Sequence, residues 1–271
     1  MSSKRNPLTK AALWQFVAAH RDNIAARGLA KVSQGYLNAW SNRANYHIGL
    51  NGEARVLEIV GHDRSGDVID AGSNVGEWAT LALDAFPKSI VHAFEPVSST
   101  AEILDRVAAR SANRLVVQRL GLSDCAGTAQ VSIPYSGSGL SSIVGRFPSA
   151  VTETIPLTTI DEYCQARRIS ELHMLKIDTE GYDHRVLEGA KSLLTNGRVD
   201  IIQFEYGAYA LDTRFLLKDF YDLLASLGYK TGKVYPNSVD FRPYDASMED
   251  FEGLTYLAVR RDRTSLIKNL S

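Results

Sequence analysis

Residues 68–76 read Val68-Ile69-Asp70-Ala71-Gly72-Ser73-Asn74-Val75-Gly76. The first three form a short apolar strand that ends in an acid, and the pattern that follows predicts a helix over residues 76–86. Glycine lets the backbone approach a ligand closely, and a helix N-terminus presents unpaired amide groups. The stretch therefore predicts a site for a nucleotide-type cofactor at the carboxyl end of a strand.

Strands and helices alternate on the C-terminal side of this stretch. We expect strands at 90–95, 115–120, 174–177 and 201–205, and helices at 98–110, 183–194 and 213–227. Such alternation favours a parallel sheet that is buried on both faces. The last two predicted strands, 229–235 and 254–260, have no room for a crossover helix between them, so we expect them to pair antiparallel.

The alternation breaks between residues 123 and 161. Short strands are predicted at 128–134 and 154–158, and the Gly/Ser-rich stretch 135–142 lies between them. A stretch of this composition fits either a plain linker or a mobile loop beside an active site. The sequence leaves both interpretations open.

The composition is that of a globular protein. Of 271 residues, 45% are hydrophobic and 23% charged, which excludes a disordered or fibrous chain. The net charge of −1 argues against a global grip on nucleic acid, and no apolar run approaches the ~20 residues of a membrane span. The cysteines, Cys125 and Cys164, suggest neither a close-spaced metal pair nor a disulfide framework, which fits a cytoplasmic protein.

The N-terminal part differs from the rest in charge. Residues 1–60 carry eight Lys/Arg and three acids, a net of +5, while the remainder carries 22 against 28, a net of −6. We expect helices here: a first one that Gly28 ends, then 32–40 and 53–60. We therefore divide the chain into a basic helical extension, 1–62, and a main domain, 63–271. The extension is either a packing cap or a lid that lines an acceptor pocket.

The glycine stretch fits one cofactor better than another. A nicotinamide dinucleotide calls for G-x-G-x-x-G, whereas this chain has G-x-N-x-G with Asp70 at the loop entrance. S-adenosylmethionine carries a sulfonium and an ammonium group and no phosphate, so a carboxylate complements it. Glu95 ends the second strand, 25 residues after Asp70, where it can accept both ribose hydroxyls.

Five blocks of sequence carry a family resemblance. They are 68–76 as quoted, Ala93-Phe94-Glu95-Pro96, Gly121-Leu122-Ser123-Asp124-Cys125-Ala126-Gly127, Leu175-Lys176-Ile177-Asp178-Thr179-Glu180-Gly181-Tyr182-Asp183, and Val186-Leu187-Glu188-Gly189-Ala190. Together they closely resemble the FkbM family of S-adenosylmethionine-dependent methyltransferases. The first block is typical of class I methyltransferases broadly, and D-x-E-G followed by V-L-E-G-A is the family-specific part. The resemblance spans residues 66–260.

The resemblance implies a fold, a reaction and a set of contacts. The fold is α/β and Rossmann-like: a seven-stranded sheet with one antiparallel strand. The reaction is O-methylation of a hydroxyl on a sugar, glycan or natural-product metabolite, with a small-molecule or glycan acceptor as partner. The implied cofactor contacts are Asp70, Gly72, Asn74 and Gly76 for the methionine half, Glu95 for the ribose, Ser123 and Asp124 for adenine, and Asp178.

Catalytic candidates follow from the need of an alcohol for a base. Asp178 and Glu180 follow the fourth strand and Glu205 ends the fifth. These carboxylates either orient cofactor and acceptor or bind Mg²⁺, which the resemblance does not demand. His47 and His184 are the candidate histidine bases, and Glu180 is also a candidate helix cap.

Two other functions stay open at this point. One is an NAD-dependent oxidoreductase, which the missing loop glycine disfavours. The other is a cofactor-binding protein without turnover, because a fold alone does not give a function. The sequence does not name the methyl acceptor or the oligomeric state.

Overall fold

The computed structural model describes residues 7–61, 66–133, 151–252 and 255–271. The chain divides into two compact units, Met1–Ala44 and Asn45–Ser271. The stretch 135–142, for which the sequence left two interpretations, lies outside the described residues, as does His62.

The first unit consists of two helices, α1 (Pro7–Ala19) and α2 (Ile24–Trp40). The predicted end at Gly28 is wrong, because this glycine lies inside α2. The break comes earlier, where the Asn23 side chain accepts a hydrogen bond from the Ala25 amide at 2.8 Å and caps a new helix. The third helix, α3 (Glu53–Gly61), lies in the second unit.

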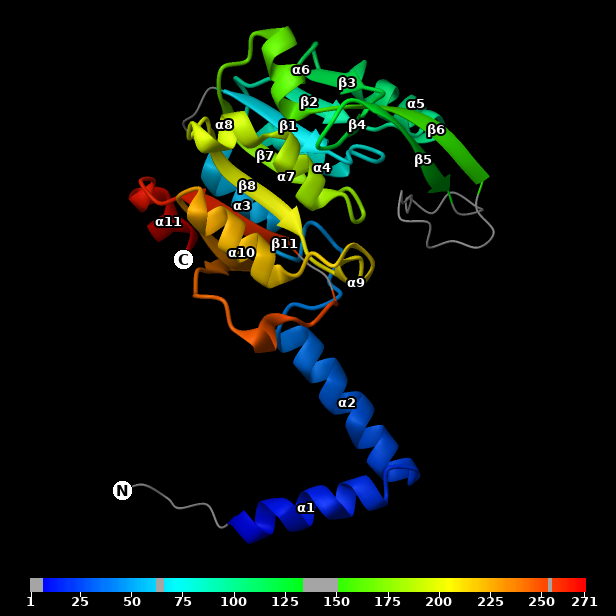
Figure 1. The fold of residues 1–271 in the computed structure, drawn as a ribbon. Helices are drawn as coiled ribbons and strands as arrows, with labels where there is room; N and C mark the ends of the chain where they lie inside the picture. The colour runs from blue at the N-terminus through cyan, green and yellow to red at the C-terminus, as the bar shows by residue number, and fades with distance from the viewer. Residues whose placement is uncertain (1–6, 62–65, 134–150, 253–254) are drawn as a thin grey trace. The chain divides into compact units, whose positions relative to one another are not determined.

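The second unit is built on one eight-stranded sheet (Figure 1). Strands β3, β2, β1, β7 and β8 run parallel to one another, and β11 pairs antiparallel with both β8 and β9. This confirms the predicted class I methyltransferase fold, to which the short edge strand β10 adds an eighth strand. The order across the sheet is β10 (Ser238–Asp240), β9 (Tyr229–Tyr235), β11 (Thr255–Arg260), β8 (Val199–Glu205), β7 (Leu172–Ile177), β1 (Asp67–Ala71), β2 (Val91–Phe94) and β3 (Leu115–Gln118).

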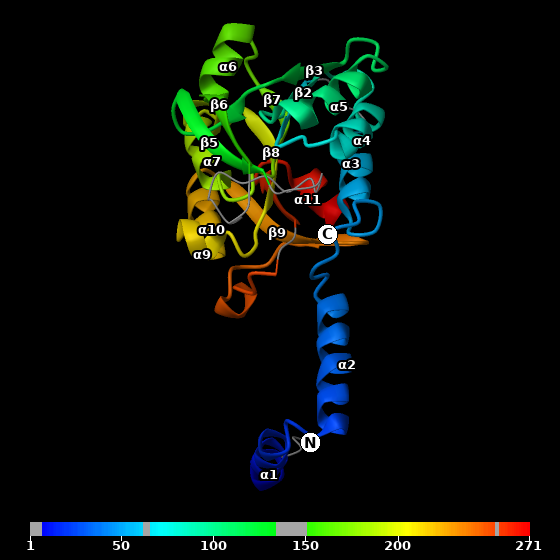
Figure 2. The ribbon, with the colours of Figure 1, turned by 90° about the vertical axis from the view of Figure 1, so that its right-hand side faces the viewer.

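Helices cover both faces of this sheet, as the view along its edge shows (Figure 2). One apolar cluster joins the sheet to α6 (Ile160–Arg167), α7 (Asp183–Gly189), α8 (Lys191–Thr195), α9 (Ala210–Thr213) and α10 (Leu217–Ser226). A second cluster joins the other face to α3, α4 (Glu77–Ala85), α5 (Ser98–Ala108) and α11 (Thr264–Leu270). The predicted helix 183–194 is divided into α7 and α8, whereas the predicted helix 213–227 is the single helix α10, which begins four residues later than expected. Side chains alternate between the two faces along each strand. Because helices cover both faces, the strands are apolar along almost their whole length.

A smaller sheet interrupts the alternation, as the sequence predicted. Its order is β4 (Gly121–Leu122), β6 (Val151–Thr158) and β5 (Gly127–Ile133). A 3₁₀ turn at Ala246–Met248 precedes β11. Both cysteines are free, Cys125 exposed and Cys164 buried. Within the described ranges, no helix combines the length and apolar character needed to cross a membrane.

Candidate active site

Two cavities lie where β1, β2, β7 and β8 end. The larger has a volume of about 780 Å³ and the smaller about 80 Å³. A volume of several hundred Å³ suits a small-molecule ligand. Four residues line both cavities: Gly72, Asn74, Asp178 and Glu180. These four therefore mark the junction between the two spaces.

The glycine loop is shaped by a close backbone approach. Gly72 has a φ of +80°, and a Cβ at this position would come within 1.9 Å of the Asp178 carbonyl oxygen. A side chain is excluded here because the loop after β1 packs directly on the segment after β7. Asn74 and Gly76 also have positive φ, so the loop turns sharply before α4 begins.

Glu95 stands at the end of β2 in the smaller cavity, as predicted from its spacing. Its Oε2 accepts a hydrogen bond from the Asn74 amide at 3.0 Å, and its Oε1 accepts one from the Val97 amide at 2.9 Å. Burial raises the pKa of this carboxyl to about 7, although the two amides act in the opposite direction. Apolar side chains of Phe94, Leu122 and Ile155 complete the wall. A carboxyl group that two backbone amides hold in place within an apolar cavity is suited to accept hydrogen bonds from the ribose of a nucleoside.

Asp70 does not line either cavity within the described residues, although the sequence placed it at the cofactor. Its side chain is 0% exposed, and Oδ1 lies 3.2 Å from Lys176 Nζ. The sheet register explains this pairing, because Asp70 on β1 is directly opposite Lys176 on β7, which in turn is opposite Gln203 on β8. In the structure Asp70 thus acts on Lys176.

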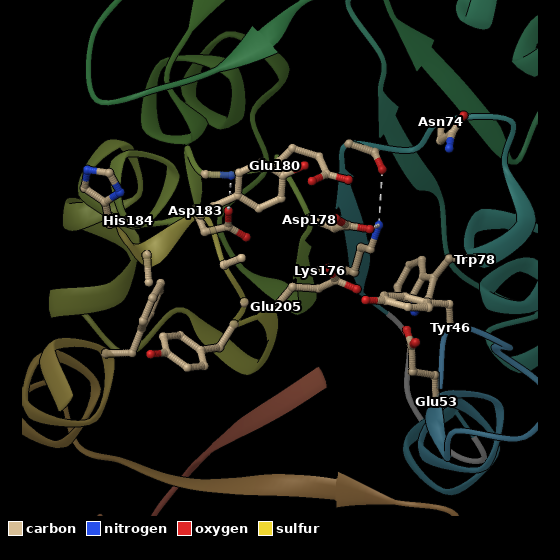
Figure 3. Close-up of a pocket in the computed structure, with 18 of the residues that line it drawn as sticks. Tyr46, Glu53, Asn74, Trp78, Lys176, Asp178, Glu180, Asp183, His184 and Glu205 are labelled. Carbon is tan, nitrogen blue, oxygen red and sulfur yellow. Dashed lines mark hydrogen bonds and ion pairs between the residues drawn. The ribbon is translucent and has the colours of Figure 1, made fainter. Parts of the chain in front are cut away.

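Lys176 is a buried cation that the sequence analysis did not single out. Its Nζ donates to the Gly72 carbonyl at 3.1 Å and to Asp178 Oδ2 at 3.2 Å (Figure 3). Burial alone would lower the Lys176 pKa, but the charges of Asp178 and Asp70 raise it above its usual value. The signal was a lysine within the apolar strand 172–177, since a charged residue is seldom buried unless it is paired.

Carboxyl groups crowd around this lysine (Figure 3). Burial, and then the charge of Asp178, raises the pKa of Glu180 to about 7. The same two causes raise the pKa of Asp183 to about 6. Asp183 Oδ2 accepts hydrogen bonds from the Gly181 amide at 3.2 Å and the Thr179 hydroxyl at 3.3 Å, and its buried Oδ1 has no partner among the described residues.

Glu205 and Glu53 complete this acid group. The charge of Asp178, then burial and the charge of Glu53, raise the pKa of Glu205 well above its usual value. Glu53 begins α3, and burial raises its pKa as well. Its two oxygens accept hydrogen bonds from Asn51 Nδ2 and Gln203 Nε2, both at 2.6 Å. The raised pKa values of these carboxyls favour their protonated forms, which lowers the repulsion between neighbouring charges.

Aromatic side chains form much of the rest of the larger cavity. Figure 3 shows Tyr46 and Trp78 on one side of the acids and His184 on the other. The His184 ring stacks on Phe215 with centroids 5.0 Å apart, and burial lowers its pKa. Trp78 is 4% exposed and its Nε1 has no hydrogen-bond partner in the described chain. The wall thus offers flat aromatic rings to a ligand.

Besides Asp70, four predicted site residues line neither cavity in the described chain: His47, Gly76, Ser123 and Asp124. His47 is exposed and does not line them, whereas Tyr46 and Ile48 on either side of it do. Ser123 is buried and donates a hydrogen bond to Asp124 Oδ1 at 2.8 Å. Asp124 also accepts one from Arg185 at 2.9 Å, and these two bonds lower its pKa. Their predicted contact with adenine stays a prediction.

The Mg²⁺ alternative finds no preformed site in the described parts of the chain. There, no set of three His, Cys, Asp or Glu side chains is arranged to hold a metal ion. The Lys176 ammonium lies 3.2 Å from both Asp70 and Asp178 and supplies positive charge at this point. Whether the reaction uses a metal stays untested.

The family model described as the methyltransferase FkbM domain matches residues 70–231. The hexuronic acid methyltransferase AglP of Haloferax volcanii is 25% identical over 173 residues, which are 63% of this chain and 70% of that protein.

The solved structures to which the fold is similar include the following two methyltransferases. The plantazolicin methyltransferase BpumL, solved in complex with SAH, is 10% identical with a TM-score of 0.44, covering 90% of this chain and 94% of that one. A TehB-like SAM-dependent methyltransferase from Corynebacterium glutamicum is 13% identical with a TM-score of 0.40, covering 86% and 100%.

Proposed function

This chain belongs to the FkbM methyltransferase domain family, whose model spans more than half of it, and from that premise we propose that it transfers a methyl group from S-adenosylmethionine to a hydroxyl of a sugar, glycan or natural-product metabolite. One observation carries the proposal: two cavities of different character meet at Gly72, Asn74, Asp178 and Glu180. A donor in one and an acceptor reaching in from the other would meet at these residues.

The residues present fit S-adenosylmethionine. The smaller cavity offers the Glu95 carboxyl, held by two backbone amides among apolar side chains, to the nucleoside. The acid group around Asp178 suits the positive charge of the sulfonium and ammonium groups. When bound, the cofactor supplies an electrophilic methyl group. A dinucleotide fits less well, because its pyrophosphate would face the same carboxyls.

The protein's own part in the reaction is to orient the acceptor and to take up its proton. We place the proton on Glu180, because it lines both cavities and its pKa of about 7 suits a base near neutral pH. Lys176 holds Asp178 in position. The raised pKa of Glu205 favours its protonated form, which can donate a hydrogen bond to an acceptor oxygen. His184 remains a second base in the same cavity.

The lining also bears on the charge of the acceptor. Seven acids line the larger cavity, and Lys176 is the one Lys or Arg among the described residues there, already paired with Asp70 and Asp178. AglP, by its name, methylates a hexuronic acid. A uronate carboxylate would lack a cationic partner in this cavity, which is costly. We therefore infer an uncharged acceptor, either a sugar or a polyol. The ring of a sugar would stack on Tyr46 and Trp78.

Calorimetry on the whole protein tests the cofactor site. Glu95→Ala should weaken S-adenosylmethionine binding by about 1.5–3 kcal/mol, the scale of hydrogen bonds to a charged group. Glu102→Ala on the exposed surface of α5 is the matched control and should leave the affinity unchanged. Equal affinity in the two variants would refute the assignment, and binding of NAD in place of S-adenosylmethionine would favour the oxidoreductase.

Transfer of labelled methyl groups to neutral methyl glycosides and to methyl hexuronides then tests the acceptor. Transfer to the hexuronides alone would refute the charge argument and leave the methyltransferase assignment intact. Cofactor binding without transfer to any acceptor would favour a protein that does not turn over. The two free cysteines support a cytoplasmic location as part of this proposal.

A further inference from the structure

Residues 1–44 expose most of their large apolar side chains. The structure leaves ten of them at least 48% exposed: Leu13, Trp14, Phe16, Val17, Ile24, Leu29, Val32, Tyr36, Leu37 and Trp40. Helix α2 has no buried residue at all. Scattered single apolar residues on a surface are ordinary, but ten within 28 consecutive residues indicate a binding surface.

The apolar and polar residues of α2 are sorted onto separate faces. Arg27, Lys31, Gln34 and Asn38 recur at helical spacing and form one narrow strip, along which Gln34 donates a hydrogen bond to Asn38 at 2.7 Å. Leu29, Val32, Tyr36 and Trp40 repeat in the same way on the opposite side. The rings of Tyr36 and Trp40 stack with centroids 6.2 Å apart. A cationic strip beside a broad apolar face with aromatic residues is typical of helices that lie in a membrane interface.

The charge of this unit decides between partners. Residues 1–44 hold seven Lys/Arg and Asp22 as their one acid, a net of +6, whereas residues 45–271 hold 23 against 30, a net of −7. Two copies of a unit with this charge repel each other, which argues against pairing of α2 with α2. The second unit offers no matching apolar face within its described residues, because its exposed large apolar side chains are spread over separate elements.

We propose that residues 1–44 bind the surface of a bilayer that contains anionic lipid. Helix α2 lies in the interface with Tyr36 and Trp40 among the acyl chains, while Arg27 and Lys31 reach the phosphate groups. Lys10, which lies over the Trp14 ring at 4.7 Å from its centroid, gives α1 the same pairing of a cation with an aromatic ring. The site is independent of the proposed methyl transfer.

Flotation of the full chain with lipid vesicles tests this proposal. Vesicles of phosphatidylcholine mixed with phosphatidylglycerol should bind the protein, and vesicles of phosphatidylcholine alone should not. Two of the three tryptophans, Trp14 and Trp40, are exposed in this unit and Trp78 is buried, so binding should shift the emission to shorter wavelength. Arg27→Glu with Lys31→Glu should reduce the affinity at least 30-fold, on the scale of basic residues near a charged surface.

A control double variant distinguishes the effect of the basic residues on α2 from the effect of net charge. Lys88→Glu with Arg106→Glu makes the same charge change at exposed positions of the second unit and should leave vesicle binding within about twofold of the wild type. Circular dichroism verifies that each variant is folded. An equal loss in both pairs, or binding to neutral vesicles as strong as to anionic ones, would overturn the proposal. So would self-association that Trp40→Ala abolishes in a protein that ignores vesicles, since the partner would then be a second copy.

Discussion

The two compact units of this chain use apolar residues in opposite ways. Residues 45–271 bury theirs in clusters on both faces of one sheet, so their polar side chains are free to converge where the parallel strands end. The described side chains of residues 10–44 contribute nothing to those clusters, and the apolar ones are exposed beside basic ones. The difference indicates that chemistry resides in the second unit and that the first unit has another role.

The strongest test of the second unit is its buried ion pair. Lys176→Met removes the cation from between Asp70 and Asp178 and leaves one fully buried carboxylate, Asp70, and one at the cavity wall, Asp178, uncompensated. We expect a loss of about 3–5 kcal/mol in the free energy of unfolding, measured by urea denaturation. Lys191→Met on the exposed surface of α8 should change it by less than about 0.5 kcal/mol.

A double variant tests whether the loss comes from charge. Asp70→Asn combined with Lys176→Met should recover part of the lost stability, because it removes one of the two stranded carboxylates. If the double variant loses as much free energy of unfolding as the two single variants added together, charge does not account for the effect. Packing of β1 against β7 would then be what Lys176 contributes.

The dependence on pH should be intermediate in size and confined to the second unit. The pKa of Glu180 is raised from 4.5 to about 7, so the folded state binds a proton in that window which the unfolded chain does not. Glu180 alone therefore lowers the stability as pH rises from 4.5 through about 7, by at most ~1.4 kcal/mol per pH unit. The rate of transfer should rise over the same window, because the base must be ionised.

Glu180→Gln separates these two effects. The variant should lose most of its activity and should lack the stability change that Glu180 contributes between pH 4.5 and about 7. Glu188→Gln on α7 is the control, since Glu188 is exposed and does not line either cavity in the described structure. A rate profile in Glu180→Gln that still rises through neutral pH would move the base to another group, with His184 next.

The site residues that could be predicted from the sequence are those with a local signal, such as a position directly after an apolar strand. Gly72, Glu95 and Asp178 each follow an apolar strand, so their place at one edge of a parallel sheet was readable. The pairing of Asp70 with Lys176 depends on the register between β1 and β7, and the bond from Gln203 to Glu53 joins residues 150 positions apart. Neither leaves a local signal.

Two further differences arise within single turns of the chain. His47 was predicted as a base, yet its neighbours Tyr46 and Ile48 line the cavity, because the direction of a side chain in a loop is not set by periodicity. Gly28 was predicted to end a helix, yet the capping bond of Asn23 begins a new one that continues through the glycine. In both cases a backbone detail decided the outcome.

The smallest effect on stability should come from deletion of the whole first unit. Among the described residues, the apolar clusters begin at Ile48, so removing residues 1–44 should change the free energy of unfolding by less than about 0.5 kcal/mol. Cofactor affinity and transfer to a soluble acceptor should persist, while binding to anionic vesicles should be lost. Denaturation, calorimetry and flotation measure the three.

A second deletion, of residues 1–50, differs from the first only by residues 45–50 and so tests the role of these six residues. Removing residues 1–50 also takes away Tyr46 and Ile48, which line the larger cavity but not the smaller one. Cofactor binding should then survive, while transfer to the acceptor should fall sharply, because the ring that stacks on a sugar is gone. If both deletions abolish transfer, residues 1–44 themselves contact the acceptor and the lid predicted from the sequence extends through them. If neither does, Tyr46 is dispensable and acceptor recognition rests on Trp78 and the aromatic residues that follow β8.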